Sequence, residues 1–134
     1  MSRNGTYHCP VEAAVAVIGG KWKTLILWKL RDAPLRFSEL QERLPIVTPR
    51  MLTKALRELA EDGIVGRTAH AEIPPRVEYA LTPLGEALTP VLDALNAWGI
   101  EYMLDAEIPF PVCCSGKAQK EIAGFIEDPA DDTP

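Results

Sequence analysis

FSELQERLPIVTPRMLTKALRELAEDGIV, residues 37–65, is the stretch that decides the fold of this 134-residue chain. It contains two helical patterns separated by a short break. Ser38 with Gln41 three residues later fits a capping box, so we expect the first helix over Ser38–Arg43. Pro45 then ends it, because proline restricts the residue before it and cannot donate a backbone hydrogen bond.

The second helix of this stretch has clear signals at both ends. Thr48 suits the N-cap, Pro49 the first helical position and Gly63 the C-terminal stop. At about 100° per residue, one side of this helix is apolar and predicts a core stripe, whereas the other is cationic. The apolar side holds Leu52, Ala55, Leu56 and Leu59, and the cationic side holds Arg50, Thr53, Lys54 and Arg57.

Two functions fit this cationic side. Long cations with a hydroxyl on one exposed helix face can reach base edges and phosphates in a DNA major groove. Taken alone, the same residues more often form an ordinary solvated face. The segments around the stretch therefore decide between the two interpretations.

Charge is distributed unevenly along the chain. The net charge is −5, but residues 1–82 hold 12 Lys and Arg against 9 Asp and Glu, and residues 83–134 hold 2 against 10. A DNA-binding half followed by an acidic portion gives this division, and so does an acidic protein with uneven loops. No apolar run approaches the ~20 residues of a membrane span, and the N-terminus lacks an apolar signal core, so we expect a cytoplasmic protein.

Two helices are expected before the stretch and a hairpin after it. The first helix begins at Pro10, and the second, Trp22 to Leu30, is apolar almost all round and should be the central buried helix. Leu35-Arg36 has the character of a very short strand. Residues 64–71 and 76–81 predict an antiparallel hairpin with its turn at 72–75.

Helices followed by a hairpin form a winged helix-turn-helix, in which one helix enters the major groove and the hairpin lies beside it over the backbone or minor groove. Arg76, at the hairpin tip, suits a phosphate or minor-groove contact. The alternative is an exposed loop arginine without a partner.

Thr82-Pro83 predicts the start of a long helix that continues to Leu104. Pro90 lies inside it and should kink it. Apolar residues recur with a period of about 3.5, which favours a dimer interface because the earlier helices already supply a core. This seam comprises Leu84, Leu88, Val91, Leu95, Trp98 and Tyr102.

These patterns predict a mainly α fold with a small β-hairpin wing, a winged helix-turn-helix with N- and C-terminal dimerisation helices. The DNA-binding and dimerisation domain covers residues 1–104. An acidic tail covers 105–134, and Ala118 to Ile126 predicts one short helix in it.

Four segments together resemble the HxlR family of bacterial winged-helix transcriptional regulators, a branch of the wider MarR-like group. They are CPVEAAVAVIGGKWKTLILWKL at 9–30, LRFSELQERLP at 35–45, MLTKALRELAEDGIVGR at 51–67 and PPRVEYALTPLGEAL at 74–88. The resemblance implies a homodimer, more often a repressor than an activator, that binds double-stranded operator DNA through the helix at 48–61, capped by Thr48, and the wing at 66–80. It implies no cofactor.

The resemblance also implies that a subset of members senses electrophiles or oxidants through a cysteine at the position of Cys9. Cys9 precedes Pro10 at the start of a helix, where unpaired N–H groups favour a thiolate, although Glu12 opposes it. Cys113 and Cys114, in the tail that the family pattern does not cover, are candidate resolving partners. The alternative is a cysteine that only caps the helix.

Other functions fit the sequence less well. An enzyme is not expected, since no Ser/His/Asp order, Gly-rich phosphate loop or metal-spaced cluster appears, and His8 and His70 are expected to be solvated. Adjacent Cys113 and Cys114 lack the gap usual in zinc sites. A winged helix used for protein–protein contact would more often expose apolar anchors than a basic face. Control by a non-covalent small-molecule ligand also stays open.

Overall fold

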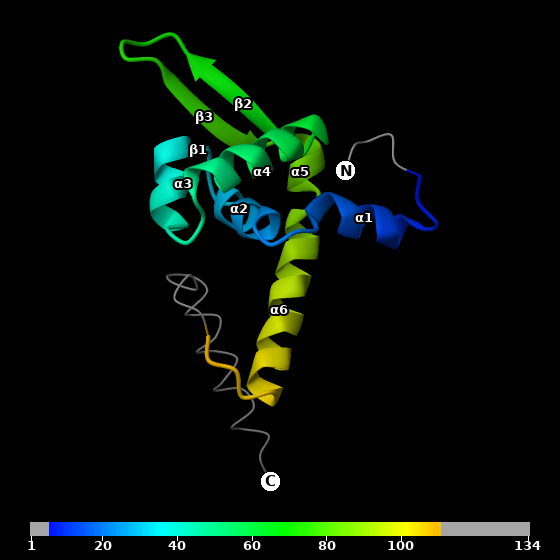
Figure 1. Cartoon of the computed structure of the whole chain (residues 1–134). Helices are drawn as coiled ribbons and strands as arrows, with labels where there is room; N and C mark the ends of the chain where they lie inside the picture. The colour runs from blue at the N-terminus through cyan, green and yellow to red at the C-terminus, as the bar shows by residue number, and fades with distance from the viewer. Residues whose placement is uncertain (1–5, 111–134) are drawn as a thin grey trace. The chain divides into compact units, whose positions relative to one another are not determined.

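The structure is a computed structural model that describes residues 6–110 (Figure 1). The chain divides into two compact units between Leu92 and Asp93. The helices are α1 Pro10–Ile18, α2 Lys23–Leu30, α3 Phe37–Arg43, α4 Pro49–Glu61, α5 Pro83–Glu86 and α6 Thr89–Asp105, and the strands are β1 Leu35–Arg36, β2 Val65–His70 and β3 Arg76–Leu81.

The core of the first unit is aliphatic and centres on α2, as predicted. Ile26 and Leu27 of α2 are fully buried, and Leu30 is almost so. Side chains from α3, α4 and the loop between them enclose these residues, namely Leu40, Leu44, Val47, Leu52, Leu56 and Leu59. The apolar side of α4 is therefore fixed in the core, and its cationic side is turned outward.

The three strands form an antiparallel sheet in the order β1-β3-β2. The hairpin runs in register from Val65 opposite Leu81 to His70 opposite Arg76, and Leu35 of β1 pairs with Tyr79 of β3. Figure 1 shows β2 and β3 extending beyond the helices of this unit. The predicted hairpin and short strand are both confirmed.

The two ends of α4 match their sequence signals. The Met51 backbone N–H donates to the Thr48 hydroxyl oxygen at 3.2 Å, which satisfies one of the unpaired donors at the helix start. Pro49 occupies the first helical position. Gly63 has a φ of 77°, in the left-handed region where a glycine bears no Cβ penalty, and so ends the helix.

The predicted capping box of α3 is wrong. The helix begins at Phe37, one residue earlier, with Arg36 as its N-cap. The Glu39 carboxylate accepts the Arg36 backbone N–H at 2.9 Å. Gln41 instead donates its side-chain amide to the Val47 carbonyl and supports the turn before α4. The acidic residue adjacent to Ser38 provided the stronger acceptor.

The single long helix predicted from Pro83 is also wrong. It is divided into α5, which ends at Glu86, and α6, which begins at Thr89. Pro90 therefore lies in the first turn of α6 rather than inside a helix. In the first turn, its missing N–H removes no hydrogen bond. Thr89-Pro90 repeats the start signal of Thr82-Pro83.

The start of α5 is fastened to the end of α4. The Thr82 hydroxyl oxygen accepts the Gly85 backbone N–H at 3.1 Å, and the hydroxyl donates to the Gly63 carbonyl at 2.6 Å. A Cβ at Gly85 would lie 2.2 Å from the Ile64 carbonyl oxygen, so this contact requires glycine. These contacts join the start of α5 directly to Gly63 and Ile64, just after the C-terminal end of α4.

The observed elements agree with the predicted fold class, helices with a small antiparallel sheet. The dimerisation role of the terminal helices and the division into 1–104 and 105–134 stay predictions. The helix expected over Ala118–Ile126 lies outside the described residues.

Candidate nucleic-acid interface

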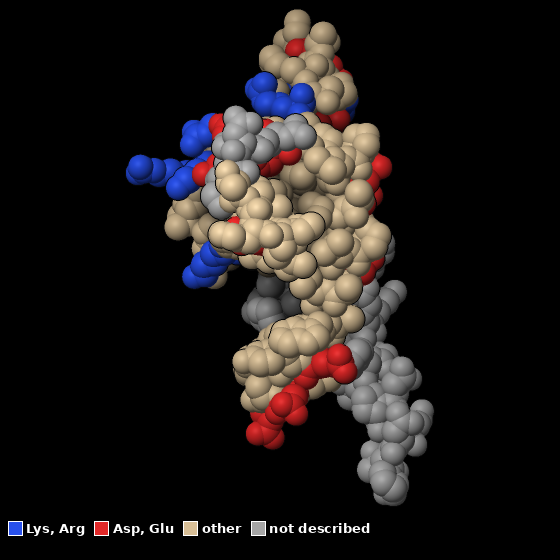
Figure 2. Space-filling view, turned by 90° about the vertical axis from the view of Figure 1, so that its right-hand side faces the viewer, with Lys and Arg blue, Asp and Glu red and all other residues tan. Residues whose placement is uncertain are grey.

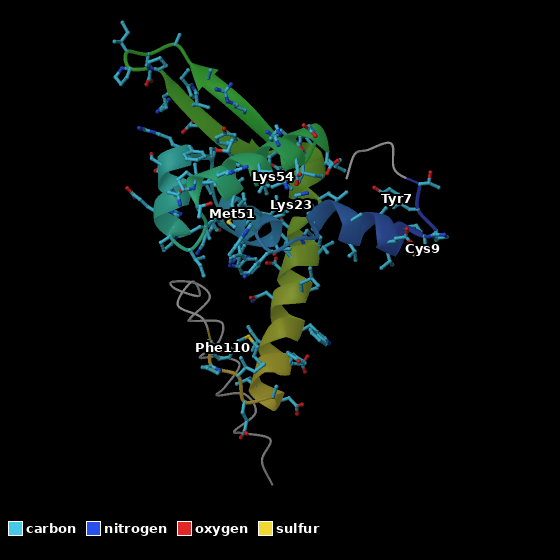
Figure 3. All side chains as sticks on the ribbon, in the orientation of Figure 1. Tyr7, Cys9, Lys23, Met51, Lys54 and Phe110 are labelled. Atoms are coloured by element: carbon cyan, nitrogen blue, oxygen red, sulfur yellow. The ribbon has the colours of Figure 1, made fainter. Side chains whose placement is uncertain are left out.

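The exposed face of α4 carries the predicted cations. Arg50, Thr53, Lys54 and Arg57 are all exposed, and with Pro49 they line one shallow depression. Figure 2 shows Lys and Arg side chains gathered along one edge of the part that holds the hairpin. Figure 3 labels Lys54 on this helix and the buried Lys23 on α2. This arrangement suits a polyanion.

The cations on α4 differ in their neighbours. Arg50, in the first turn, forms no ion pair with any residue in the described range 6–110. Arg57 lies 4.0 Å from the Glu61 carboxylate, with both side chains largely exposed, so this pair is weak. Glu61 therefore reduces the positive charge of this face near the C-terminus of α4. The positive potential is strongest near the N-terminal end of the helix.

The two threonines use their hydroxyls within the helix. The Thr53 hydroxyl donates to the Pro49 carbonyl at 2.8 Å. With its proton engaged, Thr53 can offer an external partner only its oxygen as an acceptor and its methyl group. Thr48 uses its oxygen to cap the helix, and its place at the start of α4 suits a phosphate contact better than a base contact.

An ion pair between a buried lysine of α2 and a partly exposed glutamate of α4 joins the two helices. Lys23 is only 7% exposed, and its Nζ lies 3.0 Å from the Glu58 carboxylate. The hydrogen bond from Lys23 holds the pKa of the Glu58 carboxyl below its ordinary value. Because the pKa is lowered in the folded state, the pair stabilises the fold at neutral pH and ceases to do so as the pH falls through that lowered pKa.

Glu58→Gln is expected to lower the free energy of unfolding by about 2 kcal/mol at pH 7, because it leaves the Lys23 ammonium buried without an anion. The difference from wild type should shrink at an acidic pH, as the pH falls through the lowered pKa of Glu58 and its carboxylate becomes protonated. Urea unfolding at both pH values and one protein concentration measures it. Glu61→Gln is the control, within about 0.5 kcal/mol of wild type. Equal destabilisation by both variants would show that Lys23 does not depend on Glu58.

Arg76 begins β3 at the turn end of the hairpin, as predicted. Its guanidinium lies 3.4 Å from the Glu72 carboxylate, and the side chain is about one-third exposed. Glu72 is four residues earlier across the turn. Arg76 is therefore neither unpartnered nor freely extended, and an external phosphate has to compete with Glu72.

The wing also contains features that sequence reasoning missed. Arg67 of β2 is exposed and lies opposite Tyr79, which packs on the core. Its place in segment 64–71, which was predicted to form a strand of the hairpin, was the available signal. His70, expected to be solvated, instead lies 2.8 Å from the Glu78 carboxylate and is about two-thirds buried. Arg67 is the more accessible arginine of the hairpin.

Cys9 is the N-cap residue of α1, and its thiol is exposed. Its side chain makes no capping hydrogen bond. Neighbouring His8 pairs with Glu12 at 2.9 Å, so the acidic residue of the first turn has a partner of its own. Figure 3 shows Cys9 at the N-terminal end of α1, well apart from Lys54 on α4. Cys113 and Cys114 lie outside the described residues.

Large apolar side chains remain exposed on the terminal helices. Val11 and Val15 of α1 are 71% and 59% exposed. On α6, the predicted seam residues are about half exposed, and the Trp98 and Tyr102 rings stack with centroids 5.4 Å apart. Leu88 differs, because it packs against the core. The exposed residues are Leu84, Val91, Leu95, Trp98 and Tyr102.

The described residues contain neither a metal-ligand cluster nor a membrane-spanning helix. Within residues 6–110, no three His, Cys, Asp or Glu side chains are grouped as metal ligands. None of the helices described is long and apolar enough to cross a membrane.

Comparisons with known proteins agree with this geometry. Residues 17–107 match the family described as HxlR-like helix-turn-helix. An uncharacterized HTH-type transcriptional regulator of Methanothermobacter thermautotrophicus is 54% identical over 96 residues, which cover 72% of this chain and 73% of the relative. This relative and YdeP of Bacillus subtilis are both named as transcriptional regulators, and they belong to a family of DNA-binding proteins that are not enzymes.

Solved structures give the same result. The redox regulator HypR in its oxidized form is 46% identical, with a TM-score of 0.65, and the match covers 68% of this chain and 94% of HypR. The reduced form of YodB from Bacillus subtilis is 37% identical, with a TM-score of 0.65, over 72% of this chain and 95% of YodB. This chain therefore belongs to the HxlR-like helix-turn-helix family of transcriptional regulators.

Proposed function

We propose that the protein is a homodimeric repressor that acts in the cytoplasm and binds a roughly palindromic operator. The observation that carries this proposal is the cationic face of α4, exposed while the opposite face is fixed in the core. In helix-turn-helix proteins such a face enters the major groove with its N-terminal residues first. Operator DNA is the partner that this charge and shape suit.

Each side chain has a role that follows from its surroundings. Arg50, without an ion pair in the described range, can donate two hydrogen bonds to a guanine. Thr53 accepts a hydrogen bond from a base or touches a thymine methyl group, since its proton is engaged. Lys54 and Arg57 contact phosphates, as does Thr48 at the helix start. In the wing, Arg76 and Arg67 contact the backbone or the minor groove.

The exposed seam on α6 supplies dimer contacts, and the exposed apolar residues of α1 supply others. Val91, Leu95, Trp98 and Tyr102 follow the spacing of a helix–helix seam and are exposed in the single chain. A contact of this kind between two copies produces a two-fold axis. Two-fold symmetry in the protein is mirrored by half-sites about 10 bp apart, or a multiple of that distance.

Binding of labelled duplex DNA from the region upstream of the coding sequence tests the proposal. We expect a saturable complex whose affinity falls steeply with salt. A winged helix used only for an apolar protein contact would not show this salt dependence.

We further propose that Cys9 makes the regulator responsive to oxidants or electrophiles. The thiol is exposed at a helix start, where the helix dipole favours a thiolate. HypR is described as a redox regulator, and YodB has been solved after diamide treatment and with a bound quinone. Modification of Cys9 would alter the packing of α1 and the spacing of the two recognition helices.

Diamide or a quinone is expected to weaken operator binding by wild type by about 5- to 150-fold, the usual range of coupling between two sites. Cys9→Ser should retain its affinity. Cys113→Ser and Cys114→Ser separate the two chemistries: a quinone alkylates Cys9 without them, whereas diamide removes two electrons from a pair of thiolates to form a disulfide. Equal loss in wild type and Cys9→Ser, or no loss in wild type, would leave Cys9 as a structural residue.

A further inference from the structure

Asp62, just after α4, is a buried carboxylate without a hydrogen-bond partner among the described residues. It is 3% exposed, and neither Oδ1 nor Oδ2 accepts a hydrogen bond. Its backbone N–H is satisfied by the Glu58 carbonyl at 3.0 Å, so the side chain is not needed to cap the helix. Buried carboxylates are costly unless paired, and one that is unsatisfied within residues 6–110 calls for a partner beyond them.

Asp62 lies in the wall of a cavity of about 330 Å³. This volume is at the lower end of the range for small-molecule sites. Asp62 is the only charged residue among those that line it, and Tyr7 is the only other polar one. The remaining walls come from α1, from the residue just before β2, and from α5 and the residues after it: Ala13, Ala14, Val17, Ile64, Leu84, Ala87 and Leu88.

We propose that this cavity binds a small organic cation, an amine or amidine on a compact apolar body, with its charged group on Asp62. Both carboxylate oxygens are buried and accept no hydrogen bond from the described residues, so an ammonium or the paired N–H groups of an amidinium that reaches Asp62 can donate to them. The apolar body would contact the alanine and leucine walls. An anion is disfavoured, because it would bring a second negative charge next to Asp62.

The position of the cavity connects it to the recognition helix. Asp62 directly follows the last residue of α4, and the Thr82 hydroxyl joins the adjacent Gly63 carbonyl to α5. A ligand there contacts α1, α5 and the end of α4 at once. If the protein is the DNA-binding regulator proposed above, a ligand that prefers its free form lowers its affinity for DNA by the same factor as DNA lowers the ligand's affinity.

This site is separate from Cys9. Cys9 is not among the residues that line the cavity, and the ligand forms no covalent bond. The protein would therefore have a reversible, non-covalent input in addition to any reaction at the thiol.

Calorimetric titration of the full-length protein with three matched compounds tests the proposal. Benzamidine is cationic, benzamide is its neutral isostere and benzoate is anionic. We expect benzamidine to bind wild type about tenfold or more tightly than benzamide, and benzoate not to bind, because a charge-assisted hydrogen bond to a buried carboxylate is the main polar contact. Asp62→Asn, which preserves the shape, should weaken benzamidine by a similar factor and leave benzamide almost unchanged.

A second variant protects the test against a misfolded Asp62→Asn. Ala13→Leu fills the cavity without touching the carboxylate and should weaken benzamidine. Ala60→Leu, on an exposed position outside the cavity, is its control. Equal binding of benzamide and benzamidine, or unchanged binding by both Asp62→Asn and Ala13→Leu, would overturn the proposal. A third result would also overturn it: benzamidine fails to bind wild type, and Asp62→Asn shifts the monomer–dimer equilibrium. In that case the cationic partner of Asp62 would be a side chain of a second copy of the protein.

These titrations contain no DNA, so the ligand site and the proposed function can fail separately. If benzamidine binding depends on Asp62 but the protein binds no duplex DNA, the proposed ligand site stands and its proposed link to DNA binding does not. Duplex binding unaffected by saturating benzamidine in wild type would remove the coupling to α4.

Discussion

Leu95→Glu is expected to convert the dimer into a monomer and to lower operator affinity by about 100-fold or more. Leu95 is 48% exposed, so the substitution leaves the core of the single chain intact. In the proposed dimer it would bury an unpaired carboxylate in an apolar seam. Once the two recognition helices are unlinked, each half-site is bound alone, and the gain of about 10² to 10⁴ from linkage is lost.

Ala97→Glu is the matched control, because it introduces the same side chain on an exposed position about 120° around α6 from the seam. Light scattering at micromolar concentration gives the oligomeric state, and fluorescence anisotropy with a two-half-site duplex gives the affinity. A monomeric wild type, or a Leu95→Glu variant that remains dimeric, would remove α6 from the interface.

Arg50→Ala is expected to weaken operator binding by about 5- to 150-fold per half-site and to relax the base preference at one position in each half-site. Arg50 has no ion pair in the described range and lies in the first turn of α4, so removing it frees no buried partner. The loss therefore reports contact with DNA rather than damage to the fold.

Arg50→Lys separates charge from base recognition. Lysine keeps the positive charge but not the planar fork that donates two parallel hydrogen bonds. The salt dependence should stay close to that of wild type while the base preference at that position falls. Unchanged affinity and base preference in both Arg50 variants would mean that α4 does not enter the groove with this end.

Local signals made most of the fold predictable. α4 was predicted correctly because Thr48, Pro49 and Gly63 mark its ends within the sequence itself, and its two faces follow from residue spacing. The prediction of one long helix from Pro83 was wrong because of one ambiguous feature. Thr89-Pro90 fits both a kink within a helix and the start of a new helix, and in the structure it starts a new helix.

Pairings across elements were not predictable. Lys23 and Glu58 are 35 positions apart in the sequence, on two different helices, and nothing in either segment indicates that the lysine is buried. His70 meets Glu78 only because of the register of the hairpin. The cavity around Asp62 needs α1, α4 and α5 to be placed together, so a sequence in which Asp62 simply follows a helix gives no sign of it.

The candidate DNA-binding interface was predictable only in part. The cations of α4 were identified because they share one helix face. Their neighbours were not, and the weak pair of Arg57 with Glu61 and the closer pair of Arg76 with Glu72 leave Arg50 and Lys54 as the more available cations. Both pairs join residues four apart, a spacing that the sequence displays but that does not establish contact on its own.

The salt dependence of duplex binding tests the central claim most directly. We expect the logarithm of the association constant to fall linearly with the logarithm of salt concentration. For about six phosphate contacts per dimer, the slope should be about −5. Lys54→Ala, which removes one contact from each protomer, should reduce the steepness by about two. A flat dependence, or a slope identical in wild type and the Arg50→Ala, Lys54→Ala, Arg57→Ala triple variant, would contradict DNA binding through α4.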